Sequence, residues 1–406
     1  MKNLHRDVAI VGMGLHPWGV YPNKSIAEMG VYAMSKALEN ANNMNWRQIQ
    51  AMVAGSYGFI ADREGVPGQL SATTTAAMMG KTGIPCTNIY NACATGESIM
   101  RDAYLAVASG EFDLVMAVGS DKSAGGFFRP QSRDAAFDSD FQRYTMTGET
   151  NPAYWAMEMR RRIHDVHTTE EDMALVKVAT SKGSVHNPNA RYHKAFTLQE
   201  VLASPVVCDP LRLFEICATS DGAAAIILAP ADQAYRYTKK PILIEGVSLA
   251  SGTFGDPTIV LTTMSAYYKP GGVKTLSESR NALAAAYKMS GRKPSDINII
   301  ELPDNSSWHY LAYLDMILDI DYGESEKLLR KGTFNVDGPL PVCPSGGFGA
   351  FGEAVVAQGL WQVVEVATQL RGDAGERQIT NNPKVGLAQS YGYAGNNAVV
   401  IMSRPW

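Results

Sequence analysis

Cysteine is scarce in this sequence, and none of it lies in a pattern that binds metal or builds a disulfide framework. Five cysteines are spread over 406 residues, without a CxxC pair or a cluster with histidine. Disulfide-rich secreted domains carry cysteine at much higher density, and zinc sites group cysteine and histidine closely in sequence. We therefore expect a reduced, cytoplasmic protein that holds no metal in this chain.

Long apolar runs and an excess of basic charge are also missing. No apolar stretch approaches the roughly 20 residues of a bilayer span. The N-terminus leads directly into a strand-like run without a signal-peptide core. The formal net charge of −4 gives no basic surface for nucleic acid. Hydrophobic residues make up 46% of the chain and charged residues 19%, which is typical of globular proteins. We expect neither a membrane nor a nucleic-acid partner.

The most informative stretch is residues 88–110, NIYNACATGESIMRDAYLAVASG. A tight turn around Cys93 precedes a run whose apolar residues, among them Ile99, Ala103 and Val107, recur at helical spacing. Cys93 therefore lies at or beside a helix N-terminus, where backbone N–H groups and the helix dipole favour a thiolate. Because a thiolate attacks carbonyl carbon, Cys93 is a candidate nucleophile.

A structural interpretation of Cys93 competes with this one. An isolated cysteine is usually a small buried apolar side chain. The neighbours Ala92, Ala94 and Gly96 are small, and we interpret them as leaving space for a ligand to approach the sulfur. Gly96 also permits backbone geometry that other residues resist. The remainder of the chain decides between the two interpretations.

Strands and helices alternate along the chain, which predicts an α/β fold with mainly parallel strands and right-handed crossovers. A shift of 248 residues carries Ile49 onto Ile297 and one alanine-rich helix onto another. We therefore expect a duplicated unit, with one half over 1–240 and the other over 241–406. An arginine- and aromatic-rich insertion at about 121–200 either shapes a binding pocket or forms a solvated cap or oligomer surface. The expected strands lie at 7–13, 49–56, 113–120, 223–229, 242–252, 296–304, 384–390 and 397–403, and the expected helices at 25–43, 68–82 and 276–291 and after the Cys93 turn.

Five motifs resemble the thiolase superfamily, and within it the thiolases of the sterol-carrier-protein type. The resemblance implies a duplicated thiolase fold: two βαβαβαββ halves in a five-layer αβαβα arrangement with an inserted loop domain. It also implies that Cys93 is the nucleophile, that coenzyme A is a substrate and that the chain forms a homodimer core. The motifs are NACATG at 91–96, SKGSVHNPNARYHK at 181–194, DPLRLFEICATSDGAAAIIL at 209–228, LPVCPSGGFGAFGEAVVAQGL at 340–360 and QSYGYAGNNAVVIM at 389–402.

Two departures from the family pattern remove its usual acid and base groups. Where such thiolases have His-Asp-Cys-Phe, this chain has Pro-Asp-Asn-Ser at 303–306, so Asn305 replaces the second catalytic cysteine. Where the family has Gly-His-Pro, this chain has Gly-Glu-Ala at 352–354. Glu353 thus replaces the histidine that activates the nucleophile.

Glu353 and Asn305 are the candidate replacements. We expect Glu353 at the start of a helix, so an ordinary charge in a first helical turn is the alternative. A desolvated glutamate has a pKa raised toward neutrality, which suits proton transfer. Asn305 is a candidate donor to a thioester enolate oxygen, or else a structural amide.

The candidates for substrate binding lie in the insertion, in the second glycine-rich turn and in the C-terminal loop. Arginines pair with carboxylates, and backbone N–H groups of Cys93 and of the C-terminal loop are candidate oxyanion donors. The structural alternatives are a surface arginine, a satisfied histidine and a tyrosine packed on the sheet. The candidates are Arg129, Arg143, His309, Gly347, Gly392, Tyr393 and Gly395.

The retained nucleophile and the lost histidines lead to three functional hypotheses. The first is CoA-dependent cleavage of a bulky β-ketoacyl-CoA through a Cys93 acyl-enzyme. Superfamily members with such losses work with a small OB-fold, zinc-ribbon partner subunit. The resemblance points to cleavage of benzoylsuccinyl-CoA to benzoyl-CoA and succinyl-CoA in anaerobic toluene degradation. The second is retro-aldol cleavage of steroid side-chain CoA esters, which needs a base and no cysteine. The third is a non-catalytic acyl-CoA-binding subunit.

Overall fold

The computed structural model describes residues 6–56, 70–123, 150–253, 276–392 and 395–406. Within these ranges, strands of both halves form one hydrogen-bonded sheet in the order β3-β2-β4-β7-β1-β8-β11-β10-β9. The first half contributes β1 (Val8–Gly19), β2 (Ala51–Gly55), β3 (Cys86–Asn88), β4 (Val115–Lys122) and β7 (Asp221–Pro230). The second half contributes β8 (Ile242–Ser251), β9 (Ile299–Glu301), β10 (Val385–Gly392) and β11 (Asn396–Ser403).

Strand direction differs from the expectation of a mainly parallel sheet. Parallel pairing occurs in β3-β2-β4 and between β9 and β10. The other neighbouring strands pair antiparallel. In the second half the reason is local, because β10 and β11 follow each other through a short connection without a crossover helix. The two halves join where Val8–Ile10 of β1 pairs with Ile242–Ile244 of β8.

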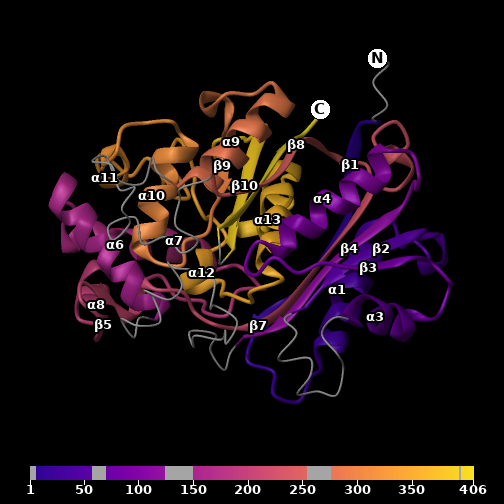
Figure 1. Ribbon diagram of the computed structural model, residues 1–406, viewed down its shortest axis with the longest axis horizontal. Helices are drawn as coiled ribbons and strands as arrows, with labels where there is room; N and C mark the ends of the chain where they lie inside the picture. Colours follow the sequence, from indigo (N-terminus) through magenta and orange to yellow (C-terminus); the bar gives the residue numbers. More distant parts are fainter. Residues whose placement is uncertain (1–5, 57–69, 124–149, 254–275, 393–394) are drawn as a thin grey trace.

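Helices cover the strands on both sides and also lie between the two halves (Figure 1). Helices α1 (Ile26–Asn40) and α3 (Ser71–Met79) pack on one face of the first-half strands through a separate apolar core. Helices α4 (Thr95–Ala108) and α13 (Gln358–Arg371) lie side by side between the strands of the two halves. Helix α9 (Ser277–Ser290) packs against β8 and β11 from the other side. These layers agree with the predicted five-layer arrangement.

Local sequence accounts for the ends of the first helix. Ser25 and Glu28 form a capping box at the start of α1, with Ser25 Oγ accepting from Glu28 N at 3.1 Å and Glu28 Oε2 accepting from Ser25 N at 2.7 Å. The predicted helix over 25–43 ends earlier, at Asn40. Asn42 and Asn43 have φ values of 58° and 56°, which lie in the left-handed region and terminate the helix.

The internal repeat is visible in the order of the elements. Short 3₁₀ turns at Trp46–Gln48 and Pro294–Asp296 lie 248 residues apart, each just before a strand of its own half. In the second half, the strand that would correspond to β3 is reduced to an isolated bridge between Ile300 and Val342. The two halves therefore share an order of elements, but the second is the less regular one.

The segment between β4 and β7 folds over the second half. It contains α6 (Asn151–Val166), α7 (Glu170–Ser184), α8 (Leu198–Leu202) and the pair β5 (Val206–Cys208) and β6 (Leu211–Arg212). Helices α6 and α7 pack against α10 (Ser307–Ile317), and α11 (Glu324–Arg330) packs against α7 and α10. No helix in the described ranges has both the length and the apolarity needed to cross a bilayer.

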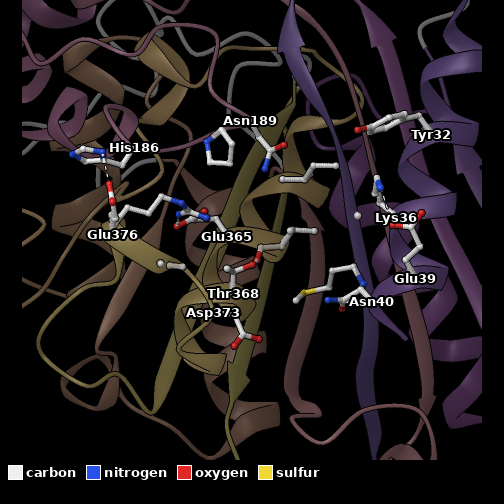
Figure 2. A pocket seen from close by; sticks show the side chains of 18 residues that line it. Tyr32, Lys36, Glu39, Asn40, His186, Asn189, Glu365, Thr368, Asp373 and Glu376 are labelled. Atoms are coloured by element: carbon white, nitrogen blue, oxygen red, sulfur yellow. Dashed lines mark hydrogen bonds and ion pairs between the residues drawn. The ribbon is translucent and has the colours of Figure 1, made fainter. Parts of the chain in front are cut away.

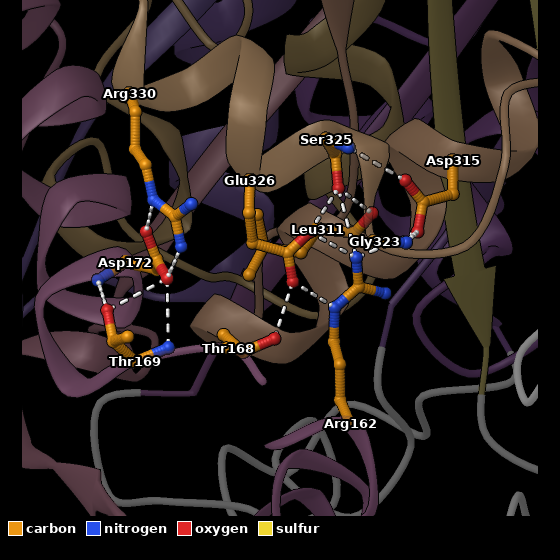
Figure 3. Close-up of polar contacts among 10 residues, drawn as sticks. All are labelled: Arg162, Thr168, Thr169, Asp172, Leu311, Asp315, Gly323, Ser325, Glu326 and Arg330. Atoms are coloured by element: carbon orange, nitrogen blue, oxygen red, sulfur yellow. Dashed lines mark hydrogen bonds and ion pairs between the residues drawn. The ribbon is translucent and has the colours of Figure 1, made fainter. Parts of the chain in front are cut away.

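A buried ionic network fixes this segment to α10 and α11 (Figure 3). Arg162 of α6 is fully buried. It donates to Glu326 Oε1 at 2.6 Å, to Asp315 Oδ2 at 2.8 Å and to Ser325 Oγ at 3.0 Å. Glu326 Oε1 also accepts from Thr168 Oγ at 2.6 Å. These contacts join residues more than 150 positions apart in sequence, so they hold the segment in a fixed position above the second half.

Candidate active site

Cys93 lies on a strained turn directly before α4, as the sequence predicts. The strain is at Ala92, whose φ is 47°, a conformation that L-residues adopt rarely. Thr95 stabilises the turn because its Oγ1 donates to Ala92 O at 2.6 Å and accepts from Asn91 N at 2.7 Å. α4 begins at Thr95, so the half-buried thiol stands two residues before the helix N-terminus.

Gly96 has a different function from the predicted one. A Cβ at Gly96 would lie 2.6 Å from Leu360 N, and a Cβ at Gly359 would lie 2.8 Å from Glu97 N. The two glycines therefore allow the N-terminal turns of α4 and α13 to touch at the backbone. Gly96 thus faces the backbone of α13, and its φ is not in the left-handed region. Because the two helices touch here, the turn around Cys93 and the glycine-rich turn at 344–353 lie at the same site.

Glu353 is fully buried but lies outside any helix, so its predicted place at a helix start is wrong. The short α12 (Gly347–Ala350) ends before it, and Gly352 has a φ of 118°. Glu353 then forms an isolated bridge with Thr219, and α13 begins five residues later, at Gln358. The extended backbone fixes the carboxyl in place through hydrogen bonds to the segment around Thr219.

The Glu353 carboxyl is paired with Asn305 and with no cation among the described residues. Asn305 Nδ2 donates to Glu353 Oε1 at 2.6 Å. Burial raises the pKa of Glu353 and the charge of Asp304 adds to the rise, whereas hydrogen bonds with Cys217, Asn305 and Gln358 oppose it. The resulting pKa is about 8. Glu353 Oε2 and Asn305 Oδ1 are buried and have no hydrogen-bond partner within the described residues. Two acceptor oxygens thus remain for a ligand.

Two residues connect this carboxyl with the nucleophile, and the sequence motifs did not single out either of them. Gln358 lies beside Glu353, and its Nε2 donates to Cys93 O at 3.4 Å. Cys217 contacts Glu353 and lies near Cys93. Cys217 stands inside the motif at 209–228, which was the available signal. Nothing in the sequence indicated that the segment of Cys217 would contact the segments of Asn305 and Glu353.

A second buried carboxyl, Asp304, lies behind Asn305. Its Oδ1 accepts from Phe348 N at 2.7 Å. Burial raises its pKa to about 7, and the hydrogen bond and the nearby Lys177 oppose the rise. A Cβ at Gly347 would lie 2.1 Å from Asp304 Oδ2. Gly347 therefore allows the glycine-rich turn to close over this carboxyl, and its predicted contact with substrate stays a prediction.

His309 is buried in an aromatic cluster on α10. Burial lowers its pKa to about 3, so the imidazole is neutral. Its Nδ1 is 2.8 Å from Ser306 Oγ. The rings of Trp155 and Tyr391 have centroids 5.1 and 6.3 Å from that of His309. These surroundings favour a packing role for His309 over proton transfer. Tyr391 belongs to β10, the strand that ends at the C-terminal loop.

The start of the C-terminal loop packs on the Cys93 turn. A Cβ at Gly392 would lie 2.5 Å from Asn91 O, so only glycine fits there. Ser390 N and Oγ donate to Glu97 Oε2 at 2.9 and 2.8 Å, which anchors β10 to α4. Gly395 has a φ of 78° and precedes β11. Three further candidates, Tyr393, Arg129 and Arg143, lie outside the described residues.

A separate cleft of about 750 Å³ lies away from these residues, between β1 and α1 on one side and the later part of α13 on the other (Figure 2). Its charged side chains are paired with one another or with neighbours. Lys36 contacts Glu39 at 2.7 Å, His186 contacts Glu376 at 2.9 Å, and Arg377 contacts Glu365. The charged groups of the cleft are therefore already paired, whereas acceptor oxygens around Glu353 have no partner within the described residues.

Comparison with known proteins decides the family. A model described as "Thiolase C-terminal domain-like" matches residues 271–404. An acetyl-CoA acetyltransferase of Methanothermobacter thermautotrophicus is 33% identical over 402 residues, which cover 98% of this chain and all of that protein. The chain belongs to the thiolase superfamily. Bovine sterol carrier protein 2 is 30% identical over 98% of this chain and 72% of its own length, in agreement with the sterol-carrier-protein type of thiolase.

One further relative and one solved structure are similar to this chain over nearly its whole length. The benzoylsuccinyl-CoA thiolase subunit BbsB of Thauera aromatica is 26% identical over 96% of this chain and 95% of its own length. A structure described as the Ltp2-ChsH2(DUF35) aldolase superposes with a TM-score of 0.81 at 22% identity, covering 99% of this chain and 98% of that one. This thiolase-superfamily chain is an enzyme of the acyltransferase class, and thiolases act on CoA thioesters. No group of three potential metal ligands occurs among the described residues.

Proposed function

We propose that this thiolase cleaves a bulky β-ketoacyl-CoA with free CoA through an acyl-enzyme on Cys93. The observation that carries the proposal is the buried Glu353 carboxyl. It occupies the motif position of the missing histidine and is connected to the Cys93 turn by Gln358. A pKa of about 8 means that part of the Glu353 carboxyl is ionised near neutral pH and can accept a proton there.

The residues divide the proposed reaction among them. Glu353 accepts the Cys93 proton, and the thiolate attacks the β-carbonyl carbon. The resulting oxyanion is stabilised by backbone N–H groups of Cys93 and of the loop at 392–395. The bond between the α- and β-carbons then breaks, the acyl group stays on Cys93, and the CoA ester departs as an enolate. Asn305 holds Glu353 Oε1 and leaves Oε2 for proton transfer. Incoming CoA finally attacks the acyl-enzyme.

We propose an aroyl substrate, benzoylsuccinyl-CoA, which would give benzoyl-CoA and succinyl-CoA. Support comes from the name of the Thauera aromatica relative, which aligns over nearly its full length. The same relative is named as a subunit, and the aldolase structure is named as a complex. We therefore propose that a homodimer of this chain works with a small OB-fold, zinc-ribbon partner subunit.

Detection of the acyl-enzyme tests this proposal. The chain is incubated with benzoylsuccinyl-CoA, with or without CoA, and peptides are analysed by mass spectrometry. We expect a benzoyl adduct on Cys93 that disappears when CoA is added. The Cys93→Ala variant should form no adduct and release no benzoyl-CoA. Acetoacetyl-CoA serves as the comparison for a small acyl group. Cleavage that persists in Cys93→Ala would contradict the thiolase mechanism.

A retro-aldolase is the second candidate, because buried tyrosines lie near Cys93. Tyr154 and Tyr391 interact with each other, and Tyr154 and Tyr313 lie near the nucleophile. A tyrosine pair can take a proton from a substrate hydroxyl without any covalent intermediate. Incubation with a β-hydroxyacyl-CoA of a steroid side chain as substrate separates the retro-aldolase from the thiolase. Cleavage that requires Tyr391 and survives Cys93→Ala would favour the aldolase.

A further inference from the structure

Cys217 lies in the site although the mechanism above does not use it. Its backbone N–H donates to Asn305 O at 2.9 Å. The next residues continue this clamp, because Ala218 O accepts from Glu353 N at 2.9 Å and Ser220 N donates to Glu353 O at 2.7 Å. The irregular segment of Cys217, between the 3₁₀ turn at Leu213–Glu215 and β7, is thus held between the two segments that carry the candidate catalytic groups.

The thiol itself faces those groups. The side chain of Cys217 is 7% exposed and contacts the Glu353 carboxyl, with Cys93 and Asp304 nearby. Burial raises the pKa of Cys217 well above the usual value, and the charge of Glu353 raises it further. The thiol therefore keeps its proton at neutral pH, whereas Cys93 must lose its proton to attack.

Unpaired acceptors around Cys217 indicate that a ligand completes the site. Asn305 Oδ1, Glu353 Oε2 and Gln358 Oε1 are all buried and have no hydrogen-bond partner within the described residues. Asn305 is 5% exposed and Glu353 and Gln358 are fully buried. Such oxygens in a protein interior are unfavourable unless a donor reaches them. The proton that Glu353 holds below pH 8 can satisfy one of them, and a bound molecule that supplies donors would satisfy the others. Cys217 therefore borders a place that a polar ligand occupies.

The reaction needs an acid at this place. When the bond between the α- and β-carbons breaks, the CoA ester departs as an enolate that must gain a proton at its α-carbon. Resting on the function proposed above, we propose that Cys217 is the general acid that protonates this carbon. The family's second cysteine is replaced by Asn305, and the backbone carbonyl of Asn305 binds the backbone N–H of Cys217.

The proton balance closes over one turnover. The Cys217 S–H bond breaks, a C–H bond forms at the α-carbon, and Cys217 becomes a thiolate. The thiol of incoming CoA gives its proton to the Cys217 thiolate, and the CoA thiolate attacks the acyl-enzyme. Cys93 leaves as a thiolate and regains the proton held by Glu353. The sum is one β-ketoacyl-CoA and one CoA converted to two thioesters, with no other reactant.

Two half-reactions separate this role from that of Cys93. The first is exchange of α-hydrogens of succinyl-CoA with solvent deuterium, which needs the acid but no acyl-enzyme. The second is exchange of labelled CoA into benzoyl-CoA, which needs Cys93 acylation but no proton at carbon. The full-length chain as isolated is used in both. Variants Cys217→Ala and Cys217→Ser are compared with wild type, and Cys343→Ala is the matched control, since Cys343 is also fully buried.

We expect Cys217→Ala to lower cleavage and α-hydrogen exchange by at least about 100-fold, while CoA exchange falls by less than about tenfold. Serine is a far weaker acid than cysteine, so Cys217→Ser should resemble Cys217→Ala. Retained α-hydrogen exchange in either variant, or an equal fall in all three activities, would contradict the proposal. Wild type without a Cys93 adduct but with Cys217-dependent exchange would contradict only the proposed thiolase function.

Discussion

Two buried clusters of charged side chains are built in opposite ways. Around Arg162, each carboxylate finds a cation: Glu326 and Asp315 both bind the guanidinium directly. Burial alone would raise the pKa of Glu326, but the hydrogen bond and the charge of Arg162 bring this pKa below its usual value. Around Glu353 no ion pair forms within the described residues, and burial raises its pKa to about 8. In the paired cluster Glu326 stays ionised, while burial raises the pKa of Asp315 and the charge of Arg162 opposes that rise. The unpaired Glu353 carboxyl, in contrast, is poised to exchange a proton near neutral pH.

Replacement of Glu353 gives the largest expected effect, and it is on catalysis. Glu353→Gln keeps the shape and removes the proton-accepting oxygen, so we expect kcat to fall about 10²–10⁴-fold. A neutral amide suits the buried site, so stability at pH 8 should be equal to or higher than that of wild type. Cleavage of benzoylsuccinyl-CoA and urea unfolding measure the two. Unchanged turnover would remove Glu353 from the mechanism.

The same variant has a pH signature. As a base, Glu353 acts when deprotonated, so wild-type kcat/KM should rise with pH through about 8. The groups around it are Asp304, Cys217 and Cys93, and the pKa of Asp304, at about 7, gives an earlier step. Glu353→Gln should lose the step near pH 8 and keep any earlier one. A wild-type profile that is flat from pH 7 to 9 would contradict the assignment.

Replacement of Arg162 reverses the pattern, because its main effect is on stability. Arg162→Met leaves Asp315 and Glu326 buried without a cation, which costs about 3–5 kcal/mol of unfolding free energy. Urea unfolding measures this loss. The control is Arg330→Met: the Arg330 side chain is 48% exposed, and Asp172, itself 1% exposed, keeps its hydrogen bonds from Thr169 N and Oγ1 when the guanidinium is removed. We expect a clearly smaller loss there. Equal losses in both variants would show that burial of the pair does not matter.

The unpaired Glu353 carboxyl should also make the unfolding free energy depend on pH. The folded-state pKa of Glu353 is raised from 4.5 to about 8, so the folded state holds a proton that the unfolded state has lost. Stability from this group is complete below pH 4.5 and decreases as the pH rises through 8, by up to about 1.4 kcal/mol per pH unit. Unfolding free energies at pH 6 and 8 measure the change. Glu353→Gln should show a smaller loss between these values than wild type.

The sequence predicts the elements and the turn that carries Cys93 well, because both depend on local patterns. Nearly every expected strand and helix occurs within a few residues, and Cys93 lies on the turn before α4. Three features could not be predicted. The extended backbone at Glu353 and the approach of Cys217 to Asn305 depend on contacts between segments that are 88 or more residues apart. The antiparallel direction of most strand pairs depends on which strands become neighbours in the sheet. Composition and periodicity carry no information about such pairs.

An exposed ion pair completes the comparison and should have the smallest effect. Lys36 and Glu39 are 2.7 Å apart on α1 at the edge of the cleft, with side chains 44% and 56% exposed. Water solvates both charges when the pair is broken, so Lys36→Ala should change the unfolding free energy by less than about 0.5 kcal/mol. Any change should vanish in 1 M salt, where the Debye length is about 3 Å. A loss above 1 kcal/mol in thermal or urea unfolding would mean that pairing itself, independent of burial, stabilises this fold.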